Sequence, residues 1–225
     1  MRRIYFTGTG PGDPELLTIK AVRVIQESDV IFVPDNRGRS MALDTIKEFA
    51  SEKRIIRIEF PMGEVTEDDY NKAASLILDN VPRNGSGVFV TIGDPMIYST
   101  ATYIMGRLRD SDMELNIVSG IPSFVAAAAR TKNPLVTKGE VFCLCDNFNK
   151  DLLDASDSIA VLKTSKDKLE ILDSMEERGF QYAYVREVTL PDEQVKESRS
   201  EILEDQAYIS MIIARRQGED KDVRD

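Results

Sequence analysis

The feature that most constrains the fold is a regular alternation of short apolar runs with longer segments whose apolar residues recur at helical spacing. Short strands separated by helices are typical of a parallel sheet with helices on both faces. We therefore expect an α/β fold. In the first part of the chain the expected strands are residues 3–8, 29–34, 55–60, 87–92 and 115–118.

Helix-start signals fall between these strands. Asp13 precedes Pro14, a pairing that favours a helix N-terminus, and Leu17, Ala21, Val24 and Ile25 then form one apolar stripe. Thr66 precedes three acidic residues, which suits the first turn of a helix. A further helix is expected from about residue 99 to 110.

The second half of the chain is less regular. We expect helices at 121–130 and 166–178, the latter ending at Gly179, and strands at 140–145, 158–162, 182–188 and 208–214. A polar connection without a helix between the last two strands would allow them to pair antiparallel. The expected domains are 1–116, with a mostly parallel sheet, and 117–216, with a mixed sheet. Residues 217–225 are expected to form a mobile, charged tail.

Composition excludes several classes of function. The 225-residue chain has no histidine, so an imidazole base and a histidine-ligated metal are excluded. Its formal charge of -10 disfavours nucleic-acid binding through a basic face. No signal peptide and no membrane span are expected. Cys143 and Cys145 alternate with apolar residues, which favours buried thiols over a disulfide or zinc site and indicates a cytoplasmic protein.

Three glycine loops follow predicted strands, and in open α/β sheets that edge binds ligands. The first loop, residues 8–14, fails as a dinucleotide fingerprint because the third glycine position holds Asp13. No P-loop pattern occurs anywhere in the chain. A tight loop with a helix cap explains this segment equally well.

The second and third loops are residues 93–95 and 119–124. Gly93 allows a ligand to approach the backbone closely, and the apolar residues that follow could cover it. In the third loop, Gly120 leads into a helix and Ser123 can form a hydrogen bond. Each loop alone also fits an ordinary turn with no ligand.

Taken together, the loops resemble one family. The patterns are G-x-G-P-G-D-P-E-L-L-T-x-K-A, G-D-P-x-x-Y-S-T and G-I-x-S-F-x-A-A-A-A, in this order. They are similar to the tetrapyrrole methylases, the class III methyltransferase fold. The segments 60–62, 93–100 and 208–216 resemble the branch that methylates C20 of precorrin-2 or cobalt-factor II. The resemblance runs from residue 3 to about 216.

The resemblance implies two α/β domains, a ligand cleft between them, a homodimer and S-adenosylmethionine (SAM) as cofactor, with S-adenosylhomocysteine (SAH) as product. The tetrapyrrole would lie on the side of the N-terminal domain, and the C-terminal domain would share the SAM site. No protein-bound metal, no nucleic-acid partner and no membrane partner are expected. The cofactor contacts that the resemblance implies are Ile92, Gly93, Asp94, Ile97, Pro122, Ser123, Leu162 and Lys163.

The substrate side is expected to include Gly10 and Asp13 of the first loop. Because a corrin precursor carries several carboxylates and this chain is acidic, a local basic lining is needed; Arg37 and Arg39 are our choice, although a solvated basic loop fits as well. The chain departs from the family at Pro122, where the usual threonine hydroxyl is missing, so only Ser123 could replace its hydrogen bond.

Methyl transfer to an electron-rich ring carbon needs no strong base for the attack, which fits a chain without histidine. Catalysis would depend mainly on positioning. Holding the reacting atoms about 3 Å apart and in line can lower the activation barrier by roughly 7–11 kcal/mol. Desolvation of the sulfonium could also help. Asp13, Asp94, Tyr98 and Tyr103 are candidates for the later proton removal by location only, and solvent is the alternative acceptor.

Three other readings stay open. The chain could methylate C11 or C17 of a related intermediate, or uroporphyrinogen III. It could be a diphthine synthase, which acts on a protein histidine. It could also be a noncatalytic tetrapyrrole-binding protein of the same fold, which need not bind SAM. The segments 60–62 and 98–100 favour the C20 branch.

Overall fold

The computed structural model describes residues 2–61, 65–164 and 166–217. The chain divides into two compact units, Met1–Ser123 and Phe124–Asp225. The first unit extends beyond the expected boundary at residue 116, because that residue lies inside a strand that pairs with the first strand of the chain. Met62 of the 60–62 segment and the tail from residue 218 lie outside the described residues.

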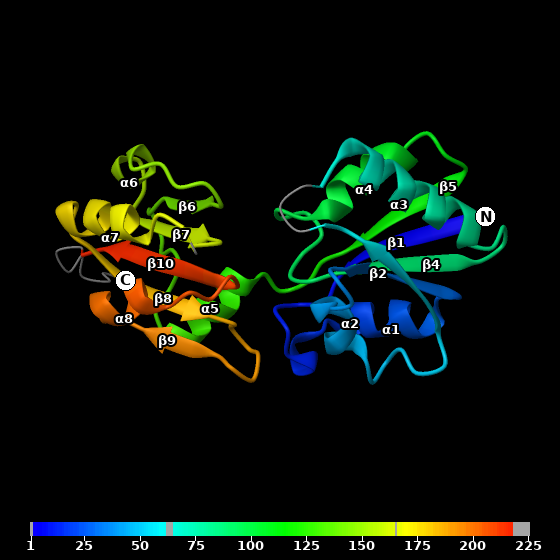
Figure 1. Cartoon of the computed structure of the whole chain (residues 1–225), viewed down its shortest axis with the longest axis horizontal. Helices are drawn as coiled ribbons and strands as arrows, with labels where there is room; N and C mark the ends of the chain where they lie inside the picture. The colour runs from blue at the N-terminus through cyan, green and yellow to red at the C-terminus, as the bar shows by residue number, and fades with distance from the viewer. Residues whose placement is uncertain (1, 62–64, 165, 218–225) are drawn as a thin grey trace. The chain divides into compact units, whose positions relative to one another are not determined.

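The first unit contains a five-stranded sheet in the order β3-β2-β4-β1-β5, and every neighbouring pair is parallel (Figure 1). Its strands are β1 (Arg2–Gly8), β2 (Val30–Asp35), β3 (Arg54–Glu59), β4 (Ser86–Thr91) and β5 (Met113–Val118). Its helices are η1 (Pro14–Leu16), α1 (Ile19–Glu27), α2 (Met41–Ile46), α3 (Glu67–Asn80) and α4 (Thr100–Leu108), and α5 (Ser123–Thr131) leads into the second unit.

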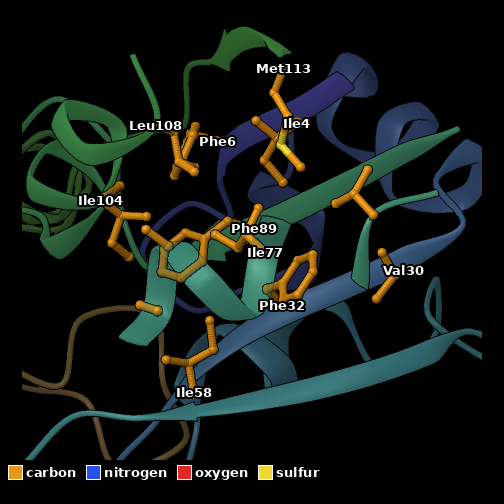
Figure 2. Packing of buried hydrophobic residues seen from close by; sticks show 14 of the residues in the cluster. Ile4, Phe6, Val30, Phe32, Ile58, Ile77, Phe89, Ile104, Leu108 and Met113 are labelled. Atoms are coloured by element: carbon orange, nitrogen blue, oxygen red, sulfur yellow. The ribbon is translucent and has the colours of Figure 1, made fainter. Parts of the chain in front are cut away.

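Alternating side chains of the central strands build a core on each face of this sheet. Phe32 and Phe89 pack with α3 and α4 in one cluster (Figure 2), whereas Ile31 and Val88 pack with α1 and α2 in the other. The near-continuous apolar strands of the sequence are therefore buried on both faces, as expected for a parallel sheet.

Local capping sets where the helices begin. Thr66 and Asp69 form a reciprocal capping box at α3, and Ser99 caps α4. The helix expected from Asp13 is interrupted, which corrects the sequence analysis. Asp13 caps only the short η1, the backbone at Leu17 is extended, and a second cap, Thr18, starts α1.

The second unit has a mixed sheet in the order β6-β7-β10-β8-β9. Only β6 and β7 are parallel, and β10 is antiparallel to both of its neighbours. Its strands are β6 (Phe142–Cys145), β7 (Ser158–Leu162), β8 (Phe180–Arg186), β9 (Gln194–Lys196) and β10 (Ser210–Arg216). Its remaining helices are α6 (Asp151–Asp154), α7 (Lys168–Glu177) and α8 (Arg199–Glu204).

Two expectations for this unit were wrong in detail. Strand β8 begins and ends two residues earlier than expected, because Gly179 and Glu187, on either side of it, have φ values of 70° and 48° that a strand cannot contain. The connection expected to lack a helix contains both β9 and α8. The expected antiparallel pairing of β8 with β10 is confirmed.

Both cysteines are free thiols, and burial raises the pKa of Cys145 to about 11. Such a thiol stays protonated and unreactive at neutral pH. In the described part of the chain, no helix is both long and apolar enough to cross a membrane.

Two neighbouring positions of α3 test how the first core contributes to stability. Ile77 is fully buried between the helix and the sheet, whereas Leu76 is 37% exposed. Replacing Ile77 with alanine should lower the free energy of unfolding by about 2–5 kcal/mol. The Leu76→Ala control should change it by about 0.5 kcal/mol. Urea unfolding followed by circular dichroism measures both, and equal effects would contradict this packing.

Candidate functional site

The three glycine loops meet at the carboxyl edge of the first sheet, because β4, β1 and β5 are adjacent strands. A Cβ atom placed on Gly8 or on Gly120 would lie under 3.0 Å from the carbonyl oxygen of Gly93. The backbones of the loops are thus in direct contact, with no room for a side chain between them. This close approach explains why the sequence places glycine at both positions.

Hydrogen bonds join the first loop to the second. The Gly93 amide donates to the carbonyl of Gly10 at 2.7 Å, and the Gly10 amide donates back to Gly93 at 3.3 Å. The Thr9 amide extends this pairing by donating to Thr91 at 2.8 Å. Gly10 is therefore part of the same backbone assembly as the predicted cofactor loop.

Asp94 joins the second loop to the third. Its Oδ1 accepts a hydrogen bond from the amide of Met96 at 2.8 Å, and its Oδ2 accepts one from the amide of Gly120 at 3.0 Å. The side chain is buried, so each carboxylate oxygen has a charge-assisted bond away from water. Because both oxygens bind backbone amides, Asp94 is well placed to hold the loops together and poorly placed to accept a proton.

The outer surface of the second loop is open and partly apolar. Gly93 has a φ of 70°, and a Cβ placed there would meet nothing within 4 Å. Ile92 and Ile97 are half-buried, and Met96 is exposed. An open glycine backbone flanked by apolar side chains can receive a ligand that has both polar and apolar parts.

The predicted contacts of the third loop lie close by in the same unit. Pro122 and Ser123 are half-buried and follow Gly120, whose amide is bound to Asp94. The structure therefore brings 93–94 and 120–123 to one sheet edge. Leu162 and Lys163 belong to the second unit, where Leu162 ends β7 and Lys163 directly follows it. Lys163 has a φ of 57°, and its Nζ lies 3.2 Å from Oδ2 of Asp146.

The residues predicted to contact substrate lie on neighbouring segments. Asp13 accepts a hydrogen bond from the amide of Glu15 at 2.9 Å. Arg37 and Arg39 are exposed on a tight turn that precedes α2. Thr45 of α2 donates to the carbonyl of Gly12 at 3.3 Å, which ties this helix to the first loop.

The two tyrosine candidates differ in their surroundings. Tyr98 follows the second loop, is half-exposed and has a φ of 43°, a strained conformation for a tyrosine. The ring of Tyr103 stacks on that of Tyr70 of α3 at 4.8 Å between centroids, and the Arg107 guanidinium lies 5.0 Å from the Tyr70 ring. The stacking gives Tyr103 a packing role between α3 and α4.

One polar residue at this edge was missed by the sequence analysis. Asp35 ends β2, its side chain is 6% exposed, and its Oδ2 lies 3.4 Å from a nitrogen of Arg57. Its Oδ1 is buried and has no hydrogen-bond partner among residues 2–61, 65–164 and 166–217. The sequence signal that could have identified Asp35 is its position directly after a predicted apolar strand, where the glycine loops also lie.

A cavity of the second unit lies away from these residues. It has a volume of about 430 Å³ and is lined mainly by β8, β10 and residues 133–135. It contains none of the predicted site residues. No group of three or more acidic or cysteine side chains in the described residues is arranged to hold a metal ion.

Comparison with known proteins decides the family. Residues 3–203 match the model of the tetrapyrrole (corrin/porphyrin) methylases. This chain is a tetrapyrrole methylase.

Two relatives of this methylase match along most of their length. A probable cobalt-precorrin-2 C(20)-methyltransferase of Methanocaldococcus jannaschii is 33% identical over 87% of this chain and 86% of its own. A cobalt-precorrin-2 C(20)-methyltransferase of Salmonella typhimurium is 29% identical over 96% of this chain and 98% of its own.

A solved structure confirms the fold of the methylase. The uroporphyrin-III C-methyltransferase of Thermus thermophilus, complexed with S-adenyl homocysteine, has a TM-score of 0.70. It is 20% identical and covers 95% of this chain and 97% of its own. The expected α/β fold, with a parallel sheet and a mixed sheet, is confirmed.

Two glycine substitutions test the contact between the loops. Gly120→Ala places a methyl group against the Gly93 carbonyl and should destabilise the first unit by about 1–3 kcal/mol. Gly106→Ala in α4 is the matched control, because its added methyl meets nothing within 4 Å. The control should stabilise the helix by about 0.5–1 kcal/mol. Thermal unfolding of both variants measures this, and a neutral Gly120→Ala would contradict the close approach.

Proposed function

We propose that this tetrapyrrole methylase uses SAM to methylate C20 of precorrin-2 or cobalt-factor II in corrin biosynthesis. The observation that carries the proposal is the match, over most of both chains, to two proteins named cobalt-precorrin-2 C(20)-methyltransferase. A chain that shared only the cofactor-binding part would match them over a shorter stretch.

The second loop is our proposed centre of the cofactor site. Open space beside the Cα atom of Gly93 would allow a ligand such as SAM to approach the backbone of this loop closely. Apolar Met96 and Ile97 would cover the rest of the ligand and exclude water. The residues that we propose as cofactor contacts remain Ile92, Gly93, Asp94, Ile97, Pro122, Ser123, Leu162 and Lys163. The comparison structure solved with S-adenyl homocysteine supports this cofactor.

When bound, SAM would supply a methyl group on a positively charged sulfur. The chain would contribute a rigid binding site for SAM. The first and third loops fix the second through the Gly10–Gly93 pairing and the Asp94–Gly120 hydrogen bond. A loop fixed before binding loses little freedom on binding, so more of the binding energy is available to align the reacting atoms.

We further propose that Gly10, Asp13, Arg37 and Arg39 face the tetrapyrrole. The exposed guanidinium groups of Arg37 and Arg39 can form paired hydrogen bonds with ring carboxylates. The expected homodimer and cytoplasmic location stay predictions.

The direct test of function is a product assay. The protein is incubated with SAM carrying a ¹³C-labelled methyl group and with either precorrin-2 or cobalt-factor II. We expect the label at C20 of the product in NMR spectra. Label at C11 or at another ring carbon would contradict the branch, and SAM binding without transfer to either substrate would contradict the proposed reaction.

Asp35 is our proposed acceptor of the proton that leaves the methylated carbon. An unpartnered buried carboxylate oxygen costs free energy that a proton or a ligand donor can recover. By contrast, Asp13 and Asp94 already accept hydrogen bonds from backbone amides. Asp35 would then remove this proton after the methyl group has been transferred.

The variant Asp35→Asn should lower kcat by about 10²–10⁴-fold, the usual range for loss of a general base. The Kd for SAH should stay unchanged, because Asp35 is not among the proposed cofactor contacts. Exposed Asp44→Asn on α2 is the matched control and should behave like the wild type. An unaltered kcat for Asp35→Asn would contradict this role and would indicate that solvent accepts the proton.

A further inference from the structure

The second unit contains a buried polar network that the proposed reaction does not use. Its centre is Asp205, the residue that directly follows α8. Its side chain is 1% exposed. Oδ1 accepts hydrogen bonds from the hydroxyl of Tyr184 and from the amide of Ala207, both at 2.8 Å. Oδ2 lies 2.6 Å from Nζ of Lys196 and 3.5 Å from a nitrogen of Arg186. The carboxylate is thus fully satisfied despite its burial.

A buried lysine extends the network to α7. Nζ of Lys168 donates to the carbonyl of Ile202 at 3.2 Å and to the carbonyl of Asp205, and it lies 4.9 Å from the centroid of the Tyr184 ring. A cation at these carbonyls stabilises the C-terminus of α8. The network therefore joins α7, α8 and β8.

Burial and hydrogen bonding shift the pKa values of the titratable groups in this network. Burial alone would raise the pKa of Asp205, but the hydrogen bonds from Lys196 and the Ala207 amide hold it well below its usual range. Burial raises the pKa of Tyr184 to about 12 and lowers the pKa of Lys168. Asp205 stays ionised and Tyr184 stays a hydrogen-bond donor through the neutral pH range.

From Ala207 the network reaches the end of β7. The hydroxyl of Ser210 donates to the carbonyl of Ala207 at 3.0 Å, and it lies 3.1 Å from the hydroxyl of Thr164. Thr164 and Ser210 are thus joined by a hydrogen bond in which either hydroxyl can donate. Thr164 is 1% exposed and directly follows Lys163.

This edge of the second sheet also concentrates backbone strain. Lys163, Glu187 and Thr189 have φ values of 57°, 48° and 66°, in the left-handed region that favours glycine. The amide of Lys163 donates to Ser210 at 3.0 Å, and the amide of Glu187 donates to Ile209 at 2.9 Å. Strained residues persist only where their surroundings hold them, and they cluster at functional sites. Here the segment that holds Lys163 and Glu187 is residues 209–210, where β10 begins.

We propose that Asp205, Tyr184 and Thr164 are positioning residues, which fix the start of β10 and through it hold Lys163 in the backbone conformation that binds SAM. This inference rests on the proposed function, because it takes Leu162 and Lys163 to be cofactor contacts. None of the three acts on the reacting atoms. Their effect is on the affinity for the cofactor.

The test removes one hydroxyl at a time from the full-length protein and measures the Kd for SAH by calorimetry. Thr164→Val keeps the shape of the side chain but loses its hydrogen bond, so the Kd should rise about three- to tenfold. Thr164→Ser restores the hydroxyl and should bind like the wild type. Tyr184→Phe, which removes a different hydroxyl of the network, should weaken binding in the same direction.

The matched control is Thr131→Val at the end of α5, where the hydroxyl donates to the helix backbone at Ala127 and Ala128. It should leave the Kd unchanged. In steady-state kinetics, Thr164→Val should raise the KM for SAM and leave kcat at saturating SAM unaltered, a split that general destabilisation does not produce.

If Thr164→Val and Tyr184→Phe melt at lower temperatures but bind SAH as tightly as the wild type, the network is structural only and the inference is overturned. If the wild type itself fails to bind SAH, that result contradicts the proposed function. The two failures are therefore distinct.

Discussion

The structure of the candidate site depends on one contact, the packing of three loop backbones against each other at the carboxyl edge of the first sheet. Gly8 and Gly120 allow this contact because neither has a Cβ atom to collide with the Gly93 carbonyl. Asp94 then accepts the Gly120 amide and fixes the arrangement. A substitution that separates these backbones would move every proposed cofactor contact of the first unit together.

The two units hold their strand ends by different means. In the first unit, glycine permits the required backbone conformations, and reciprocal amide–carbonyl bonds hold them. In the second unit, non-glycine residues such as Lys163 and Glu187 adopt left-handed conformations beside a segment anchored by the buried carboxylate of Asp205. Both arrangements produce a fixed surface, which suits a reaction whose rate depends on alignment.

Much of the fold could be predicted because its signals are local. Apolar runs located all five strands of the first sheet, and the acidic residues after Thr66 located the start of α3. Short α2, α6 and α8 were missed, because six or fewer residues hardly establish a helical period. The early end of β8 was also missed, since a left-handed glutamate has no sequence signature.

The candidate site was only partly predictable for the same reason. The glycine loops were visible as motifs, but the use of both Asp94 oxygens by backbone amides depends on a contact with Gly120, which is distant in sequence. The unpartnered oxygen of Asp35 and the Asp205 network likewise arise from tertiary contacts. Residue type and spacing indicate where polar groups occur along the chain, and only the fold determines which of them are paired.

The central claim is that the glycine-loop edge binds the sulfonium cofactor. Hydrogen–deuterium exchange of the full-length protein, with and without SAH, tests it most directly. The account predicts slower exchange of backbone amides in residues 92–97 and 119–123 when SAH is bound. Protection confined to the segments that line the cavity of the second unit, residues 180–183 and 213–216, with no change at the glycine loops, would contradict it.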